Sequence, residues 1–334
     1  MRLLFICGLF WISICGLQAQ DAHFSQMYAS PMHLNPAFVG SSPEGKFSFS
    51  YRAQWAKLPG EFATYQASYE YSTPKKPTNV GVMVLMDKVG AVGATSTQVQ
   101  GFYAHNIKLT KQVGLRAGVQ ASYSNRSLDY FKLTFGDQLD ELGYTGSPTA
   151  EQGLPNLNVS YWDAGAGLVL YAEDFWIGIS AYHLNEPRYN WGSSIEFVPR
   201  RYAVQAGFKI AKPKAGKDKN DNAWTLIPAL HYSQQGSFRQ LDAGINYHIN
   251  SLLLGVWYRG LPVAKTHYAA LVSMAGFQYK QFAFMYSYDL GLSQFALATG
   301  GAHEFSLGIK LGTYESKRKL RRKSNELIFP QFMF

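Results

Sequence analysis

Charged residues stand singly among apolar or small neighbours at positions spread along the chain. They are Arg52, Arg116, Asp163, Arg259 and Asp289. Successive side chains of a β-strand point to opposite faces, so each of these charges is expected to lie on the polar face of its strand. Arginine and aspartate side chains gathered inside a protein can pair with one another, or they can line a site that selects an anionic ligand. The sequence leaves both interpretations open.

Residues that could support hydrolytic or metal chemistry form no recognisable constellation. The chain has no Gly-x-Ser-x-Gly motif of the kind that presents a nucleophilic serine. His303 and Glu304 are neighbours on an expected strand, so they point to opposite faces and are poorly placed to ligate one ion together. The acidic residues between Asp129 and Glu141 lack the spacing of an EF-hand loop. We therefore predict a protein that is not an enzyme and that has no metal or cofactor site.

The elements that carry the charged residues are short segments of alternating character. In Lys280–Leu290, aromatic residues occupy every second position, with small or polar residues between them. An apolar outer wall and a polar inner wall are typical of a transmembrane barrel, so we predict an all-β, outer-membrane type antiparallel β-barrel of about 14 strands. The expected strands are 46–55, 62–71, 80–87, 95–109, 113–126, 162–171, 175–183, 201–210, 223–233, 239–249, 252–259, 267–279, 281–290 and 302–313. Glycines at 114, 118, 165, 167, 207 and 308 are expected to point inward and to leave room for a plug, a substrate segment or water.

The connections between these strands sort by length. The shortest, such as Thr110–Gln112 and Ala172–Asp174, follow even-numbered strands, whereas the longest, Ser127–Tyr161 and Leu184–Arg200, follow odd-numbered strands. Bacterial barrels have short periplasmic turns and long outer loops, so both chain ends are expected in the periplasm. The basic connection 211–222 is a long exception on the periplasmic side.

The N-terminal residues predict export. Arg2 precedes an apolar run, and Leu17-Gln18-Ala19 is typical of a signal-peptide cleavage site. Both cysteines, Cys7 and Cys15, fall within this segment, so the mature chain is expected to contain no disulfide. The predicted organisation is a signal peptide at 1–19, an irregular periplasmic lead-in at 20–45, the transmembrane barrel at 46–313 and a basic, aromatic-ended periplasmic tail at 314–334.

Positive charge is concentrated near the C-terminus. The chain has a formal net charge of +9, and a run of lysines and arginines lies between residues 317 and 323. Nucleic acid is not an expected partner of an exported barrel, so the tail is interpreted either as a solvated segment near lipid phosphates or as a docking peptide. The residues expected to dock periplasmic partners are Asn35, Pro36, Lys317, Arg318, Arg321, Arg322, Phe332 and Phe334.

Several motifs occur in the order found in one known family. The first members are Phe24–Tyr28, Asn35–Gly40, Tyr51–Trp55 and Asp87–Gly90. The later members are 168–171, 176–184, 257–259, 286–289 and 303–304. Together they cover nearly all of the mature chain, which resembles the PorP/SprF family of the type IX secretion system of Bacteroidota.

The resemblance implies an outer-membrane barrel that supports export or surface attachment of proteins with a C-terminal sorting domain, such as gliding adhesins. It also implies no enzymatic activity and no cofactor, with outer-membrane lipid, a secreted client and periplasmic secretion components as partners. The basic tail matches no motif of the family. The alternative is a passive or substrate-specific porin whose lumen Arg52, Arg116 and Arg259 make anion-preferring.

Overall fold

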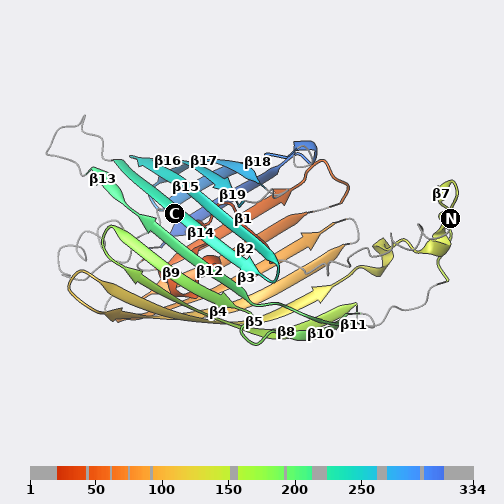
Figure 1. Cartoon of the computed structure of the whole chain (residues 1–334), viewed down its shortest axis with the longest axis horizontal. Helices are drawn as coiled ribbons and strands as arrows, with labels where there is room; N and C mark the ends of the chain where they lie inside the picture. The colour runs from red at the N-terminus through yellow and green to blue at the C-terminus, as the bar shows by residue number, and fades with distance from the viewer. Residues whose placement is uncertain are drawn as a thin grey trace, which may run out of the picture.

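The computed structural model describes residues 21–42, 45–60, 62–73, 76–90, 93–150, 157–191, 194–212, 224–261, 269–293 and 297–311. Long antiparallel strands form one sheet that closes on itself, because β1 pairs with both β2 and β19 (Figure 1). The strands of the first half are β1 (Lys46–Gln54), β2 (Ala63–Ser72), β3 (Thr78–Val89), β4 (Ala94–Lys108), β5 (Gly114–Ser127), β8 (Asn158–Tyr171) and β9 (Phe175–Tyr182). Those of the second half are β12 (Arg201–Phe208), β13 (Ile210–Lys212), β14 (Trp224–Gln235), β15 (Phe238–Ile249), β16 (Leu252–Arg259), β17 (Ala270–Tyr279), β18 (Phe282–Gly291) and β19 (Ala302–Lys310).

The sheet is a 14-strand antiparallel barrel, which confirms the predicted fold class. Both β12 and β13 pair with β14, so they act as one wall strand with a short break at Lys209. Every expected strand is present. The largest difference between expected and observed strand bounds is at β8, which begins at Asn158 instead of residue 162. Among the described residues, no helix is long and apolar enough to cross a bilayer.

Burial alternates along the strands as their residue types predict. In β1, Lys46, Ser48, Ser50 and Arg52 are buried, while the aromatic residues between them are exposed on the outer wall. Register then aligns aromatic residues of neighbouring strands, and Tyr51 faces Tyr65 on one side and Phe305 on the other. Such cross-strand aromatic pairs stabilise a sheet, and here they form a wall suited to lipid.

The connections differ at the two ends of the barrel. One end, the short-turn rim, has turns such as Thr110–Gln112 and Ala172–Asp174. The other end, the long-loop rim, has the connection that contains η2 (Tyr130–Lys132), η3 (Gly136–Gln138), β6 (Leu139–Asp140) and β7 (Gly143–Tyr144). The next long connection forms a separate hairpin of β10 (Arg188–Trp191) and β11 (Ser194–Phe197). In Figure 1 the first of these connections extends far beyond the barrel.

Residues 21–42 lie inside the barrel, where they form a plug (Figure 1, red). This differs from the sequence interpretation, which placed residues 20–45 in an irregular lead-in at the periplasmic face. The plug contains a four-residue helix, α1 (Pro31–Leu34), and the 3₁₀ turn η1 (Pro36–Phe38), each beginning at a proline. Proline suits the first helical position because its φ angle is already close to helical and its missing N–H is not needed there.

Candidate functional site

The plug runs through the lumen from the long-loop rim to the short-turn rim. At its start, Asp21 contacts His183, Arg201 and Gln235, which lie where β9, β12 and β14 reach the long-loop rim. Near its end, Gly40 and Ser41 donate backbone hydrogen bonds to Glu70 close to the short-turn rim. The candidate functional site is therefore a lumen occupied by the chain's own N-terminal segment.

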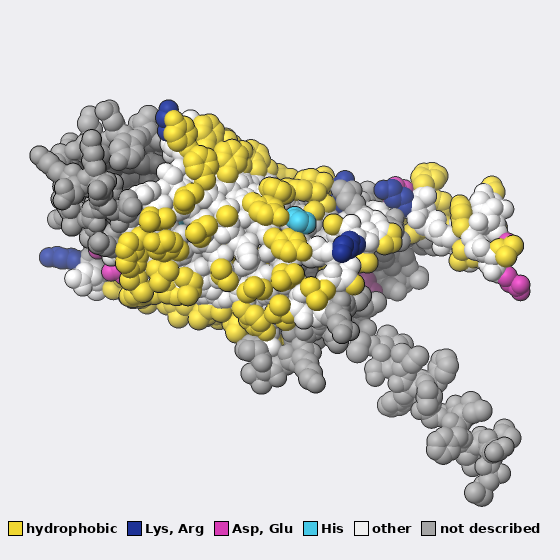
Figure 2. Space-filling model, turned by 90° about the horizontal axis from the view of Figure 1, so that it is seen from above, with side chains coloured by type: hydrophobic (Ala, Val, Ile, Leu, Met, Phe, Trp, Pro, Cys, Tyr) yellow, Lys and Arg dark blue, Asp and Glu magenta, His cyan; other side chains and the backbone are white. Residues whose placement is uncertain are grey.

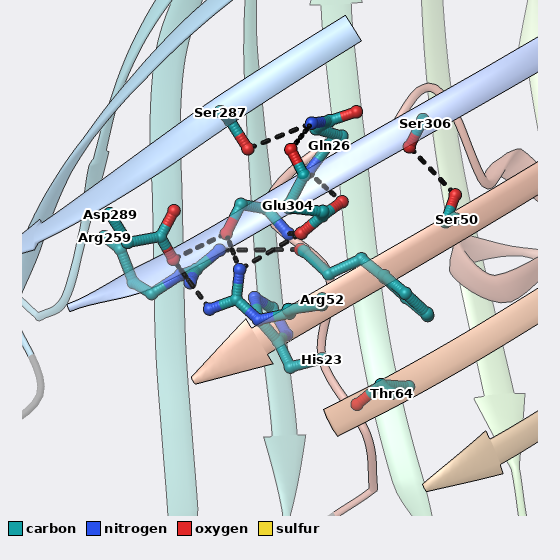
Figure 3. A network of polar contacts seen from close by, with 12 residues as sticks. His23, Gln26, Ser50, Arg52, Thr64, Arg259, Ser287, Asp289, Glu304 and Ser306 are labelled. Carbon is teal, nitrogen blue, oxygen red and sulfur yellow. Dashed lines mark hydrogen bonds and ion pairs between the residues drawn. The ribbon is translucent and has the colours of Figure 1, made fainter. Parts of the chain in front are cut away.

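An ion network lies inside the lumen, toward the long-loop ends of the strands that carry it (Figure 3). Arg52 of β1 reaches Asp289 of β18 at 2.7 Å and Glu304 of β19 at 3.0 Å. Arg259 of β16 contacts the same Asp289 oxygen at 2.8 Å and reaches Asp242 of β15 at 2.8 Å. Two cations and three anions from five strands are thus joined in one buried network.

The plug completes the hydrogen bonding of this network. The backbone N–H groups of Ser25 and Gln26 donate to the two carboxylate oxygens of Glu304 at 2.7 and 3.0 Å, and the Ser25 hydroxyl donates to Asp289 at 2.6 Å. The Gln26 amide donates to Ser287 and to the backbone carbonyl of Glu304 (Figure 3). A buried charge needs both an opposite charge and satisfied hydrogen bonds, so the wall network and the plug depend on each other.

A second cluster holds the start of the plug near the long-loop rim. His183 lies between two carboxylates, with its Nε2 2.8 Å from Asp21 and its Nδ1 3.0 Å from Asp163. Burial lowers the pKa of His183, but Asp21 and Asp163 outweigh it and raise the pKa to about 9. Burial raises the pKa of the Asp21 carboxyl. The positive charges of His183 and Arg201 have a larger, opposite effect and hold that pKa below its usual range. The cluster therefore carries an imidazolium paired with carboxylates at neutral pH.

Two histidines of the plug contact polar groups in the lumen. The Nε2 of His23 lies 3.8 Å from a carboxylate oxygen of Asp242. The Nε2 of His33 lies 2.9 Å from the carbonyl oxygen of Ala22, a contact in which the imidazole N–H donates.

A third cluster lies toward the short-turn rim. Lys46 and Glu70 form a buried ion pair of 3.2 Å, and Glu70 also accepts hydrogen bonds from the plug. Arg116 donates to the carbonyl oxygen of Val39 at 3.2 Å and lies over the ring of Tyr171. These contacts fix the end of the plug where the chain turns into β1.

Apolar packing fills the space between the polar clusters. Met27, Leu34 and Phe38 of the plug belong to one buried cluster with wall residues, and these include Val169, Trp176, Trp257, Met274 and Met285. Tyr28 packs against both tryptophans, with ring centroids 6.2 Å from Trp176 and 5.8 Å from Trp257. A barrel wall normally faces water on its inner side, whereas here the inner wall includes a packed hydrophobic core.

Glycines in the wall give the plug its space. A Cβ atom built on Gly118 would lie 2.4 Å from the backbone nitrogen of Ala37, and one built on Gly167 would lie 2.0 Å from the Asn35 side chain. Space left beside Asp21, His33 and Arg201 amounts to a polar cavity of about 20 Å³, which is room for about one water molecule.

The structure places the charged residues singled out from the sequence within the lumen. Arg52, Arg259 and Asp289 meet in the ion network, Asp163 joins the cluster with His183, and Arg116 contacts the end of the plug. The structure therefore distributes them among three separate groups, two toward the long-loop rim and one toward the short-turn rim.

The expected docking role of Asn35 and Pro36 does not fit their position. Both are buried, and Asn35 donates to the carbonyl oxygens of Leu168 and Ile179 and to Gln205. The Asn35 oxygen also accepts from the backbone N–H of Ala37, which caps η1. These residues hold the plug to β8, β9 and β12. The other docking candidates, Lys317, Arg318, Arg321, Arg322, Phe332 and Phe334, lie outside the described residues.

Several partners in the networks were not singled out from the sequence. Asp242, Glu70 and Lys46 lie at inward positions of their strands, and the same alternation that identified Arg259 would have identified them. In the sequence, Glu304 belongs to a family motif and is a poor metal ligand beside His303, and neither observation predicts its place in the ion network. In the described part of the chain, no group of three or more His, Cys, Asp and Glu side chains could hold a metal ion.

Comparison with known families gives one match that spans most of the chain. A family model described as type IX secretion system membrane protein PorP/SprF matches residues 16–309. No curated protein matches the sequence.

Similar solved structures include the toluene transporter TbuX of Ralstonia pickettii, at 12% identity and a TM-score of 0.45, covering 83% of this chain and 90% of that one. A deletion mutant of the monoaromatic hydrocarbon channel TodX is 10% identical with a TM-score of 0.43, covering 86% and 93% of the two chains. A mutant of the Rh. blastica porin is 10% identical with a TM-score of 0.34, covering 79% and 98%.

Proposed function

The chain belongs to the PorP/SprF family of type IX secretion system membrane proteins, and from this membership we propose that it supports export or surface attachment of proteins with a C-terminal sorting domain. Gliding adhesins are an example of such clients. The observation that carries the proposal is the family match over nearly the whole barrel. The plug adds to it, because a lumen filled by the chain itself suits a barrel that holds proteins better than one that passes solutes.

The two rims would serve different partners. The long-loop rim would face the cell exterior and hold the secreted client through residues 127–161 and 184–200. The short-turn rim would face the periplasm, where the connection 211–222 and the basic tail would meet the secretion machinery. This orientation follows from the usual sorting of short periplasmic turns and long outer loops. It also requires export through a signal peptide at 1–19, which lies outside the described residues.

The porin alternative assigns Arg52, Arg116 and Arg259 to an anion-preferring channel. Arg52 and Arg259 are instead paired with carboxylates, and Arg116 is buried against the plug. Single-channel conductance in planar bilayers separates the two functions. We expect the purified barrel to be nearly silent, and a steady conductance with anion preference would favour the porin.

The proposal itself is tested in cells. A tagged barrel is recovered from gently solubilised outer membranes, and the bound proteins are identified by mass spectrometry. Recovery of a secreted protein through its C-terminal domain, or of periplasmic secretion components, is the expected result. Two results together would contradict the proposal. The tagged barrel would be recovered with lipid alone, and deletion of the gene in a separate strain would leave the secreted proteins unchanged.

The basic tail has a separate test. Deleting residues 316–334 is expected to release periplasmic partners while the heat-modifiable mobility of the barrel stays intact, because the tail lies beyond the last strand. Recovery of the same periplasmic partners from the truncated protein would show that the tail does not dock them.

A further inference from the structure

One connection at the long-loop rim, residues 128–150, projects far from the barrel (Figure 1). We call it the projecting loop. It presents large apolar side chains to solvent, with Phe131 93% exposed and Leu142 98% exposed. Leu139 and Tyr144 are also more than half exposed. Exposed apolar residues gathered on one element of a folded protein commonly mark an interaction site.

The projecting loop has its own internal structure, although it lies beyond the sheet. Gln138 is buried at its centre, where its side-chain oxygen accepts from the backbone N–H of Phe135 and its amide donates to the carbonyl oxygen of Ser147. Asp137 accepts from the hydroxyl of Thr149 and from the backbone N–H of Ala150. These bonds hold the backbone of the loop in one shape.

Acidic residues surround the apolar ones. The projecting loop contains Asp129, Asp137, Asp140 and Glu141 but only one basic residue, Lys132, in a chain whose overall net charge is +9. Acidic side chains are visible at the far end of the loop in Figure 2, next to apolar ones. At the tip, the Asp140 carboxylate accepts from the backbone N–H of Leu142 and so fixes the turn that presents the leucine.

We propose that the projecting loop is a docking element whose partner has an apolar pocket bordered by basic side chains. Leu142 at the tip enters the pocket, Glu141 faces the basic border, and Phe131 in η2 adds a second apolar contact. The partner is the secreted client, so this inference rests on the proposed function. Charge complementarity selects the partner and raises the association rate. The buried apolar side chains supply most of the binding energy and so lower the dissociation rate.

The test uses variants that change the surface of the loop without removing its internal bonds. Phe131→Ser combined with Leu142→Ser removes the apolar anchors, and Glu141→Lys reverses one charge that has no structural role in the turn. Thr134→Ala, at another exposed position of the same loop, is the matched control. Each variant replaces the wild-type gene in the full chain, and outer-membrane abundance and heat-modifiable mobility establish that the barrel is folded.

The readout is the set of proteins that move from the cell surface to the medium when the gene is deleted. We expect the double serine variant to release at least ten-fold more of these proteins than wild type, and Thr134→Ala to release none beyond the wild-type level. Glu141→Lys is expected to increase their release at low ionic strength and to make release less dependent on added salt than in wild type, because the attraction that salt screens has been lost.

The outcomes separate this inference from the proposed function. If deletion of the gene releases proteins but the double serine variant retains them, the projecting loop is not the docking element and the proposed function stands. If deletion releases no protein and changes no secretion, the proposed function fails and the docking inference fails with it.

Discussion

At the scale of single residues, Arg52 shows how the lumen is held together. It is 2% exposed, and it contacts one carboxylate on β18, one on β19 and the hydroxyl of Ser25 in the plug. A buried ion pair is expensive to form, because both charges give up their hydration. Removing one member is costlier still, since the remaining charges stay buried without a partner.

Replacing Arg52 with leucine is therefore expected to destabilise the folded barrel by about 3–5 kcal/mol. The measurement is the free energy of unfolding in detergent, from denaturant titration followed by heat-modifiable mobility. Lys111→Leu, in an exposed short turn, is the control and should change stability by less than about 0.5 kcal/mol. Equal effects of the two substitutions would show that the ion network contributes little to stability.

His183 predicts a dependence of stability on pH. Its pKa is raised from 6.5 to about 9 in the folded protein, so its contribution is fully present below pH 6.5 and is lost as the pH rises through 9. At about 1.36 kcal/mol for each pKa unit, the loss between these values is roughly 3 kcal/mol. Unfolding midpoints measured from pH 6 to pH 10 should fall for wild type and change much less for His183→Gln. The same slope in both proteins would exclude His183 as the cause.

At the scale of elements, the plug takes the place of the water that fills a porin. It is a continuous part of the chain before β1, and it contacts strands around the barrel through ion pairs, backbone hydrogen bonds and apolar packing. The wall is shaped to receive it, because glycines of β5 and β8 lie where side chains would strike Asn35 and Ala37. Plug and wall therefore form one core.

Gly118→Leu should displace the plug, because its side chain would occupy the backbone position of Ala37. The expected result is a measurable single-channel conductance, together with new protease cleavage within residues 21–42. Gly101→Leu is the matched control, since Gly101 is exposed on the next strand, β4, and a Cβ atom there meets only one backbone oxygen, at 4.0 Å. A Gly118→Leu barrel that folds, stays silent and keeps its protease resistance would show that the plug tolerates the insertion.

At the scale of the whole molecule, the barrel has two chemically distinct ends. The long-loop rim carries the acidic projecting loop, while the short-turn rim has exposed lysines such as Lys108 and Lys111. An apolar outer wall separates them, and Figure 2 shows apolar side chains spread over that wall. The two rims therefore differ in the charge that they present to a partner.

The orientation can be measured with single cysteines, because the expected mature chain has none. Leu142→Cys is expected to react with a membrane-impermeant maleimide in intact cells, and Lys111→Cys only after the outer membrane is permeabilised. Immunoblotting of the labelled protein gives the readout, and the unsubstituted chain is the control. Labelling of Lys111→Cys alone in intact cells would reverse the assignment of the two rims.

The sequence by itself determined the wall of this protein. Apolar and polar residues alternate in stretches such as 280–290, because successive side chains of a strand point to opposite faces. The number of strands, their bounds and the inward direction of Arg52 and Arg259 could therefore be predicted from the sequence. The family was accessible as well, through motifs that recur in order from Phe24 to Glu304.

Only the tertiary structure decided what fills the lumen. Residues 21–42 have no strand alternation, and their partners lie up to 279 positions away in the chain, as with Ser25 and Glu304. Local patterns carry no information about such distant contacts, so Asn35 and Pro36 looked like surface residues of a periplasmic lead-in. Closure of the barrel brings five strands around one network, and this closure gives the buried charges their partners and places the plug among them.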